Sequence, residues 1–304
     1  MPVINVVLGL TGLLLVLTLS SCSAALPESG PALSTTAYSN GQLLATPEWL
    51  AAHLKDADLR FLDIRSSDEY KEGHIPGAVN ITLPQITDES NSAVDNVAPP
   101  GKIENVMGDA GVDNNTTVVV YDDGRNLMAA RMFWVLEYYG HPRVKLLNGG
   151  FDRWRKEGRE MTRVVPQPAK ARFTARPDAS RLATKAQVEA VLGKSDIALV
   201  DTRSAQEYKA DHIFGALNVD WVNNLTSASA SAFKSARELE KLYEGAGVTR
   251  DKEVITYCQT GMRAANTYFT LRLLGYDRVR LYDGSWQEWA SASSTPTDMG
   301  DSCT

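Results

Sequence analysis

The chain has 304 residues, which suits two domains better than one at about 150 residues per domain. Hydrophobic residues make up 43% and charged residues 22%, which argues against a disordered chain, a coiled coil and a multi-span membrane protein. The net charge of −6 provides no basic excess for binding nucleic acid, and three cysteines are too few for a disulfide scaffold.

The first 22 residues contain no Lys, Arg, Asp or Glu, and residues 3–19 are almost wholly apolar. This stretch is at the lower limit for crossing a bilayer and also suits the core of a signal peptide. The following Leu19-Ser20-Ser21-Cys22 resembles the lipobox of bacterial lipoproteins, although no Lys or Arg precedes the apolar core. The resemblance implies a signal peptide over residues 1–21, lipidation of Cys22 and a lipid-anchored protein on the extracytoplasmic side of the cell envelope.

Two other interpretations of this segment are a secretory signal cleaved near Ser23-Ala24-Ala25 and an uncleaved anchor. All three put the folded part outside the cytoplasm. Residues 22–40 are rich in Ser, Ala, Pro and Gly, which predicts a flexible tether. Residues 292–304 are expected to form a mobile tail, whose Cys303 is either a spare thiol or an internal sulfur acceptor.

An internal repeat organises the rest of the chain. Residues 63–78 read DIRSSDEYKEGHIPGA and recur at 201–216 as DTRSAQEYKADHIFGA, 138 positions later. Two further pairs match at 136 and 135 positions: Val118–Tyr121 with Val254–Tyr257, and Gly149–Trp154 with Gly284–Trp289. Collinear matches of this extent indicate two copies of one domain. The copies are predicted over 41–163 and 179–291, with a proline-containing linker at 164–178.

Within each copy, short β-branched runs alternate with helical stretches. In the second copy the pattern predicts strands over Ile197–Asp201, Val254–Tyr257 and Arg278–Tyr282, and helices over Ser204–Ala210, Met262–Leu274 and Ser285–Ser291. Apolar runs of this length suit strands buried on both faces, and the alternation favours a central parallel sheet flanked by helices. The predicted fold class is therefore α/β.

The copies diverge after the second matched strand. The second copy reads Tyr257-Cys258-Gln259-Thr260-Gly261-Met262-Arg263, whereas the first has Asp122 in the place of Cys258 and a loop one residue longer. Ligands of open parallel sheets bind beyond the carboxyl ends of the strands. Loop N–H groups, a helix N-terminus and Arg263 would stabilise an anion there. We therefore expect Cys258 to be a thiolate nucleophile in an anion cradle.

These motifs resemble those of tandem-domain rhodanese-type sulfurtransferases over most of the two copies: the repeated DIRSSDEYKEGHIPGA motif, the loop CQTGMRA and the closing LNGGFDRW and YDGSWQEW. The resemblance implies a catalytic second copy and an inactive first one. Cys258 would carry sulfur as a persulfide, wrapped by the loop residues Gln259, Thr260, Gly261 and Met262. Arg263 and Arg203 would bind substrate, and no cofactor or metal is implied. The donor would be thiosulfate, and the acceptor cyanide or a thiol.

Three alternatives remain open at this point. Mercaptopyruvate is the competing donor, although the arginine in CQTGMRA suits a small dianion such as thiosulfate. A phosphatase would need a Cys-x5-Arg loop, one residue longer than the spacing from Cys258 to Arg263. A sulfur-binding lipoprotein without a catalytic role is the third alternative.

Several other residues have structural explanations. For Arg203 this is a salt bridge to a nearby carboxylate. Asp201 is more readily structural than catalytic. A histidine stands at this position in both copies, as His74 in the first and His212 in the second, so we expect each to hydrogen-bond to its own loop. Phe214 departs from the usual HIPG motif, which puts the shape of that loop in question. Asp122-Asp123 lack the further ligands a metal site needs. The closing helices should be packed by Trp154, Trp286 and Trp289.

Overall fold

The computed structural model describes residues 1–2, 38–88, 97–227, 230–292 and 295–298. Cys22 and Cys303 lie outside these residues, so signal cleavage, lipidation and a role for the tail cysteine stay predictions. The chain divides into Met1–Leu33 and Ser34–Thr304, and both copies belong to the second unit. Within the described part of the chain, no helix has the length and apolar character needed to span a bilayer.

The first copy is built on a five-stranded sheet of order β1-β5-β4-β2-β3 in which every neighbouring pair is parallel. Its strands are β1 Leu44–Ala45, β2 Leu59–Asp63, β3 Ala78–Asn80, β4 Thr117–Tyr121 and β5 Val144–Leu147. Its helices are η2 Gly41–Leu43, α1 Pro47–Ala52, α2 Ser67–Glu72, α3 Leu83–Ile86, α4 Pro100–Asp109, α5 Leu127–Tyr138 and α6 Gly150–Lys156.

The second copy repeats this plan, with order β6-β13-β12-β7-β9 and parallel neighbours. Its sheet strands are β6 Leu182–Ala183, β7 Ile197–Asp201, β9 Leu217–Asn218, β12 Glu253–Tyr257 and β13 Val279–Tyr282. Two further pairs of strands are β8 His212–Ile213 with β14 Thr297–Asp298, and β10 Leu225–Ser227 with β11 Ala230–Phe233. Its helices are η3 Ala179–Arg181, α7 Lys185–Val191, α8 Ala205–Ala210, η4 Trp221–Asn224, α9 Ala236–Gly245, α10 Met262–Leu273 and α11 Ser285–Ser291.

The α/β prediction with two tandem domains is confirmed. The predicted strand Ile197–Asp201 and the helix Ser285–Ser291 have the observed bounds, and the other four predicted elements differ by one residue at one end. The alternation of side chains along each strand explains why the pattern was readable. Val118 and Val120 join one core cluster, and Val119 joins the cluster on the opposite face of the sheet.

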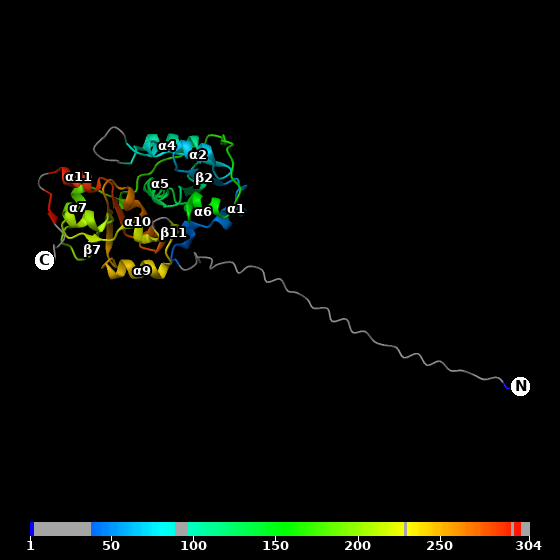
Figure 1. Ribbon diagram of the computed structural model, residues 1–304. Coiled ribbons are helices and arrows are strands. Elements are labelled where there is room, and N and C mark those ends of the chain that lie inside the picture. The colour runs from blue at the N-terminus through cyan, green and yellow to red at the C-terminus, as the bar shows by residue number, and fades with distance from the viewer. Residues whose placement is uncertain (3–37, 89–96, 228–229, 293–294, 299–304) are drawn as a thin grey trace. The chain divides into compact units, whose positions relative to one another are not determined.

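The largest core cluster contains residues of both copies. Helices α5 and α10 pack against each other across the junction (Figure 1). The rings of Phe133 and Phe269 meet there edge to face, with centroids 4.8 Å apart. Each of these helices follows the loop at the end of its copy's central strand, β4 or β12. The junction between the copies therefore lies next to the loop that begins with Cys258 and its counterpart that begins with Asp122.

The folded part begins earlier than the predicted tether boundary at residue 40. Tyr38 is buried and its hydroxyl donates to the carbonyl of Lys234, while the N–H of Asn40 donates to the carbonyl of Leu273 at 3.0 Å. These contacts tie the segment before the first copy to the second copy. The prediction of a flexible tether is therefore wrong for residues 38–40.

The predicted mobile tail is also wrong for residues 295–298. Thr297 and Asp298 form β14, which pairs antiparallel with β8. The repeat gives the physical reason, because Thr162 pairs with His74 in the same way after the first copy. Phe214 adds a contact that proline cannot make, since its N–H donates to the carbonyl of Pro296 at 3.3 Å.

The linker at 164–178 contains no helix or strand and lies against the first copy. The N–H of Ala171 donates to the carbonyl of Gly108, and that of Arg176 to Tyr139, both at 3.0 Å. Phe173 is buried and packs against His141. The linker is thus an ordered segment that packs along the first copy.

Candidate active site

Cys258 follows β12 directly, at the carboxyl end of the central strand of the second sheet, and is buried. Two contacts from the start of α11 hold its backbone: its N–H donates to Ser285 Oγ at 3.1 Å, and its carbonyl accepts from the Trp286 N–H at 3.0 Å. The loop ends at Gly261, which has a φ of +84° and precedes the first residue of α10. Gly261 is buried, whereas Gln259, Thr260, Met262 and Arg263 are partly exposed.

Ser285 has an unfavourable backbone conformation. Its φ of 52° lies in the left-handed region, which costs free energy for a residue with a Cβ. Its Oγ accepts from Cys258 and donates to the carbonyl of Tyr282 at 2.8 Å. The counterpart in the first copy is Gly150, with a φ of 53°, where a Cβ would come within 2.7 Å of Gly124 Cα. Only the copy with the thiol therefore has this hydroxyl.

Asp122 takes the place of Cys258 in the first copy and shows what this edge of the sheet can bind. Its buried carboxylate accepts four backbone N–H groups at 2.9 to 3.2 Å, from Gly124, Asn126, Met128 and Ala129. Burial and the neighbouring Asp123 carboxylate raise the pKa of Asp122 to about 6, against the effect of these N–H groups. The four N–H donors that converge on this carboxylate make the loop and helix start of the first copy an anion cradle.

Arg263 makes a bidentate ion pair with Glu207, with both N–O distances at 2.8 Å. Glu207 is held in turn by the capping box at the start of α8, where Ser204 Oγ donates to it at 2.8 Å. The hydrogen bond to Glu207 raises the pKa of Arg263 against the effect of burial. Arg263, close to Cys258, therefore already has a carboxylate partner, and that pairing lowers the pKa of Glu207 to about 2.

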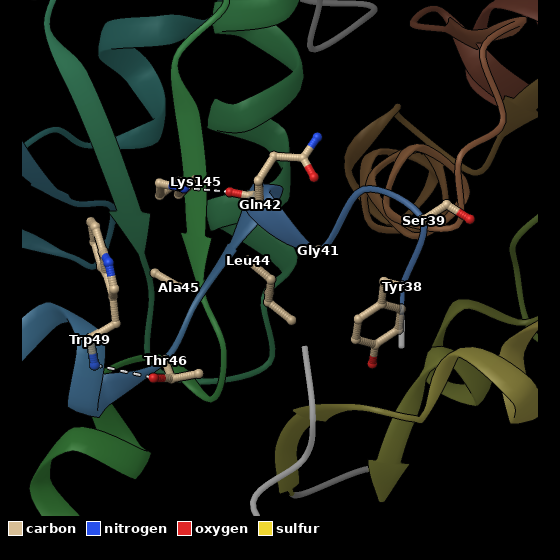
Figure 2. Close-up of a pocket in the computed structure, with 9 residues that line it drawn as sticks. All are labelled: Tyr38, Ser39, Gly41, Gln42, Leu44, Ala45, Thr46, Trp49 and Lys145. Atoms are coloured by element: carbon tan, nitrogen blue, oxygen red, sulfur yellow. Dashed lines mark hydrogen bonds between the residues drawn. The ribbon is translucent and has the colours of Figure 1, made fainter. Parts of the chain in front are cut away.

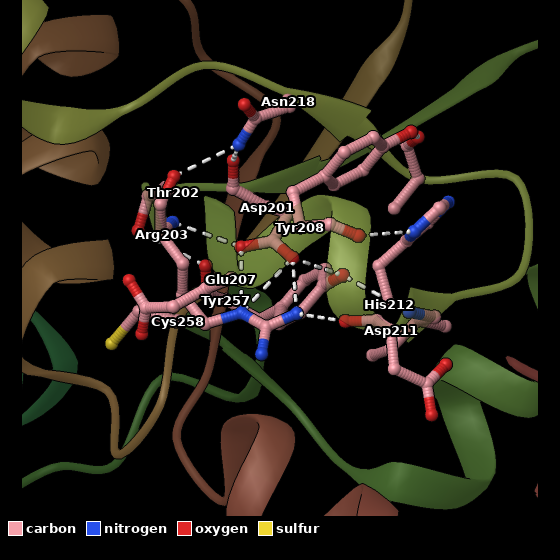
Figure 3. Close-up of polar contacts among 12 residues, drawn as sticks. Asp201, Thr202, Arg203, Glu207, Tyr208, Asp211, His212, Asn218, Tyr257 and Cys258 are labelled. Atoms are coloured by element: carbon pink, nitrogen blue, oxygen red, sulfur yellow. Dashed lines mark hydrogen bonds and ion pairs between the residues drawn. The ribbon is translucent and has the colours of Figure 1, made fainter. Parts of the chain in front are cut away.

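Arg203 is part of a buried polar unit (Figure 3). Its Nη2 lies 2.7 Å from Asp201 Oδ2 and 2.7 Å from the carbonyl of Asp211. The Tyr257 hydroxyl donates to Asp201 Oδ2 at 2.8 Å. Arg65 and Asp63 form the same ion pair in the copy without a cysteine. The charge of Arg203 is therefore balanced by Asp201, and the same pair in the first copy favours the structural explanation. A role for Arg203 in binding substrate stays a prediction.

The two repeated histidines bind their own loops, as expected. His74 Nδ1 lies 2.9 Å from the carbonyl of Tyr70, and His212 Nδ1 lies 2.8 Å from that of Tyr208. Each ring also stacks on the ring of the same tyrosine. Trp154 and Trp289 are fully buried, whereas Trp286 is partly exposed and lies against the Arg203 guanidinium.

Sequence reasoning missed Glu207, Ser285 and the pair formed by Arg131 and Asp283. Glu207 and Ser285 stand inside recognised motifs, and the exchange of Gly150 for Ser285 between the copies was a usable signal. No signal in the sequence pointed to Arg131, because it lies in the first copy and contacts the second only in the folded chain.

The pocket at the start of the first copy is a separate feature. It has a volume of about 500 Å³ and is lined by nine residues (Figure 2): Tyr38, Ser39, Gly41, Gln42, Leu44, Ala45, Thr46, Trp49 and Lys145. None of them belongs to the loop from Cys258 to Arg263, so this pocket is not assigned to the site. In the described ranges, no group of three or more His, Cys, Asp or Glu is placed to hold a metal ion.

Comparisons with known proteins bear on this site. The family model described as Rhodanese-like domain matches residues 46–157 and 184–292. The sulfur carrier protein TtuD of Thermus thermophilus is 35% identical over 291 residues, covering 87% of this chain and 99% of that protein. The thiosulfate sulfurtransferase of Pseudomonas aeruginosa is 34% identical over 271 residues, covering 86% and 99%.

Solved structures agree with this relationship. SseA of Escherichia coli, whose structure is described as that of a 3-mercaptopyruvate sulfotransferase with a rhodanese fold, has a TM-score of 0.74 and 28% identity, covering 80% of this chain and 98% of that one. EanB has a TM-score of 0.78 at 22% identity, covering 86% and 70%, which shows a shared fold. With both copies matched, the chain belongs to the rhodanese-like domain family.

Proposed function

We propose that this protein is a sulfurtransferase that moves the sulfane sulfur of thiosulfate, through a persulfide on Cys258, to a thiophilic acceptor. One observation carries the proposal: a buried thiol stands at the strand end where the other copy binds a carboxylate with four backbone N–H groups. The relatives named thiosulfate sulfurtransferase support the choice of donor.

The transfer has two steps. The Cys258 thiolate attacks the outer sulfur of thiosulfate, the S–S bond breaks, and sulfite leaves with the bonding electron pair. The acceptor, cyanide or a thiolate, then attacks the outer sulfur of the persulfide. The bond between the two sulfur atoms breaks and returns the electron pair to Cys258, so no redox cofactor is needed.

Intact-mass spectrometry after thiosulfate treatment tests the proposal. We expect wild type to gain one sulfur atom and to lose it on addition of cyanide, whereas Cys258→Ser gains none. The matched control is Asp122→Ser, which changes the corresponding residue of the first copy and should still gain the sulfur. Loading that persists in Cys258→Ser would contradict the proposal.

Mercaptopyruvate is a second candidate donor. The pairing of Arg263 with Glu207 favours it, because a balanced charge beside the thiol gives a dianion less advantage over a monoanion. The similarity to SseA supports the same candidate. Comparing kcat/KM for the two donors decides between them, and turnover with neither would contradict the enzyme class.

The physiological acceptor is a further part of the proposal. The relative named a sulfur carrier protein supports a thiol on a partner protein as acceptor, with turnover of small molecules incidental. A Cys258→Ser protein that fully restores the cellular phenotype of a deletion strain would instead favour a role that does not depend on sulfur transfer.

We also propose a lipid anchor at Cys22, on the strength of the apolar segment and the Leu19-Ser20-Ser21-Cys22 motif. The mature protein would then lie on the extracytoplasmic side of the membrane. Labelling cells with a fatty-acid analogue should mark wild type and leave Cys22→Ala unmarked. Equal labelling of both, or of neither, would contradict lipidation at this cysteine.

A further inference from the structure

The two copies meet through related but unequal contacts. Arg131 lies on α5 of the first copy and forms a bidentate ion pair with Asp283, in the closing motif of the second copy. Both side chains are buried, at 0% and 5% exposure. The copy without the cysteine therefore contributes a charged side chain to the copy that has it.

This ion pair packs against the end of the cysteine loop. A Cβ on Gly261 would lie 2.6 Å from Asp283 Oδ1 and 3.2 Å from Arg131 Nη1. Gly261 is held at a φ of +84° directly before α10, and Asp283 stands two residues before Ser285, which accepts the Cys258 N–H. The pair thus contacts the loop at Gly261 and is linked to Cys258 through the closing motif.

The corresponding positions on the other side of the junction are uncharged. The counterparts of Arg131 and Asp283, 135 positions away, are Asn266 and Asn148. Asn148 Oδ1 accepts the N–H of Phe233 at 3.1 Å, as Asp283 Oδ2 accepts that of Val97 at 2.7 Å. Asn266 Nδ2 donates at 3.0 Å to the carbonyl of Asn126, the residue before α5.

Stability alone does not explain why one side of the junction has a buried ion pair and the other has asparagines, because a buried ion pair adds little net stability. Desolvating two charges costs about as much as their attraction returns, and neutral partners often serve equally well. The junction itself shows that asparagines can occupy these positions, at Asn266 and Asn148. The charged version occurs on the side that contacts the cysteine loop.

We propose that Arg131 is a positioning residue for the Cys258 loop, supplied by the copy that lacks the thiol. By pairing with Asp283 it fixes Gly261 and the contact between Ser285 and Cys258, and thereby the geometry in which the persulfide forms. This inference rests on the proposed function and deepens it. It means that the first copy contributes a residue that helps to hold the Cys258 loop in place.

The test uses the full chain and three variants. Arg131→Met leaves Asp283 buried without its partner, and should lower both the thermal midpoint and the rate of persulfide formation. The double variant Arg131→Asn/Asp283→Asn gives this side of the junction the residues of the other side, with an acceptor kept for the Val97 N–H. The control Asn266→Ala disturbs the junction on the side of the Asp122 loop.

We expect the double variant to recover most of the thermal midpoint while single-turnover persulfide formation stays about tenfold to a hundredfold below wild type. Asn266→Ala should lower the midpoint and leave that rate within about twofold of wild type. A double variant with wild-type rate would show that the pair only stabilises the fold. An equal loss of rate in Asn266→Ala would show that general weakening of the junction is the cause, and either result overturns the proposal.

A second readout is independent of the donor. Amide hydrogen exchange of residues 258–261 should be faster in Arg131→Met and in the double variant than in wild type, and unchanged in Asn266→Ala. Arg131→Lys keeps the charge but not the bidentate geometry, so its exchange rate should lie between those of wild type and Arg131→Met. If wild type formed no persulfide with thiosulfate, the proposed function would fail, and the exchange rates would still decide whether Arg131 holds the loop.

Discussion

The ends of β4 and β12 are the same structure put to two uses. In both, the closing motif donates to the residue after the strand: Phe151 N–H to the Asp122 carbonyl at 2.9 Å, and Trp286 N–H to the Cys258 carbonyl at 3.0 Å. In the first copy a carboxylate of the chain itself takes the loop N–H groups. In the second, the side chain at this position is the buried thiol of Cys258. The comparison teaches that the same strand end holds a hydrogen-bonded carboxylate in one copy and a buried thiol in the other.

The residues around the two strand ends also differ between the copies. The second copy has a strained serine where the first has Gly150, an arginine where the first has Met128, and a buried ion pair where the first has asparagine. The serine conformation and the desolvated ion pair both cost free energy, and all three features lie in or next to the cysteine loop. The first copy therefore serves as an internal reference for what the fold needs without catalysis.

The largest effect is expected at Gly261. Gly261→Asn puts a Cβ where Asp283 Oδ1 is 2.6 Å away, so it should displace the ion pair and the loop, and reduce turnover by about a hundredfold. The counterpart exchange, Asn126→Gly, relaxes a left-handed asparagine and should leave turnover within about twofold, since it acts on the loop without a thiol. Steady-state assays of both variants check this. Equal losses in the two would break the comparison.

The next effect concerns Ser285. Both Ser285→Ala and Ser285→Gly remove the acceptor of the Cys258 N–H, and should slow persulfide formation about tenfold. Leaving that buried N–H unpaired costs about 1–3 kcal/mol of unfolding free energy. The glycine variant recovers about 1 kcal/mol by relieving the left-handed strain. Urea unfolding should therefore rank glycine above alanine while their rates agree. Rates that instead follow the stability order would contradict the positioning role of the hydroxyl.

A smaller, opposite effect is expected from Glu207→Gln. The change keeps the capping box of α8 and removes the carboxylate that balances Arg263, so KM for thiosulfate should fall a few-fold at low salt and less at high salt. Glu69→Gln is the matched control, because Glu69 closes the same capping box at α2 and Met128 takes the position of Arg263. The prediction fails if KM stays the same, or if both variants shift it alike.

The repeat made most of the fold readable from the sequence. Because β-branched strands and capped helices recur at fixed spacing, one copy checked the other, and Cys258 was identified as the residue that breaks the repeat. The errors at the ends of the folded part came from composition. The segments around Tyr38 and Thr297 look like linker, and only their pairing partners, far away in the chain, make them ordered.

The electrostatics of the site could not be read in this way. Two arginines were assigned to substrate from their motifs, but the partners Asp201 and Glu207 balance both charges. Pairing depends on side-chain directions that a motif does not contain. The contribution of Arg131 was out of reach for the same reason, since it crosses the junction between the copies.

The smallest effect is on acid stability, and it again separates the copies. The folded-state pKa of Glu207 is about 2, mainly because of the hydrogen bond from Arg263, and lies below the usual 4.5. A lowered acid pKa stabilises the fold fully above about pH 4.5, and this contribution is lost as pH falls toward 2. Because the pair is partly exposed, wild type should exceed Glu207→Gln by about 1 kcal/mol or less at pH 7.

Urea unfolding of both proteins from pH 7 to pH 2, at constant ionic strength, measures this difference. It should shrink to zero over the acid range, and Glu69→Gln, which leaves the Arg263 pair intact, should keep the acid-dependent contribution. A difference between wild type and Glu207→Gln that stays constant with pH would mean that Arg263 is not held by an ionised Glu207. The balanced charge beside Cys258, on which the expected fall in KM depends, would then be absent.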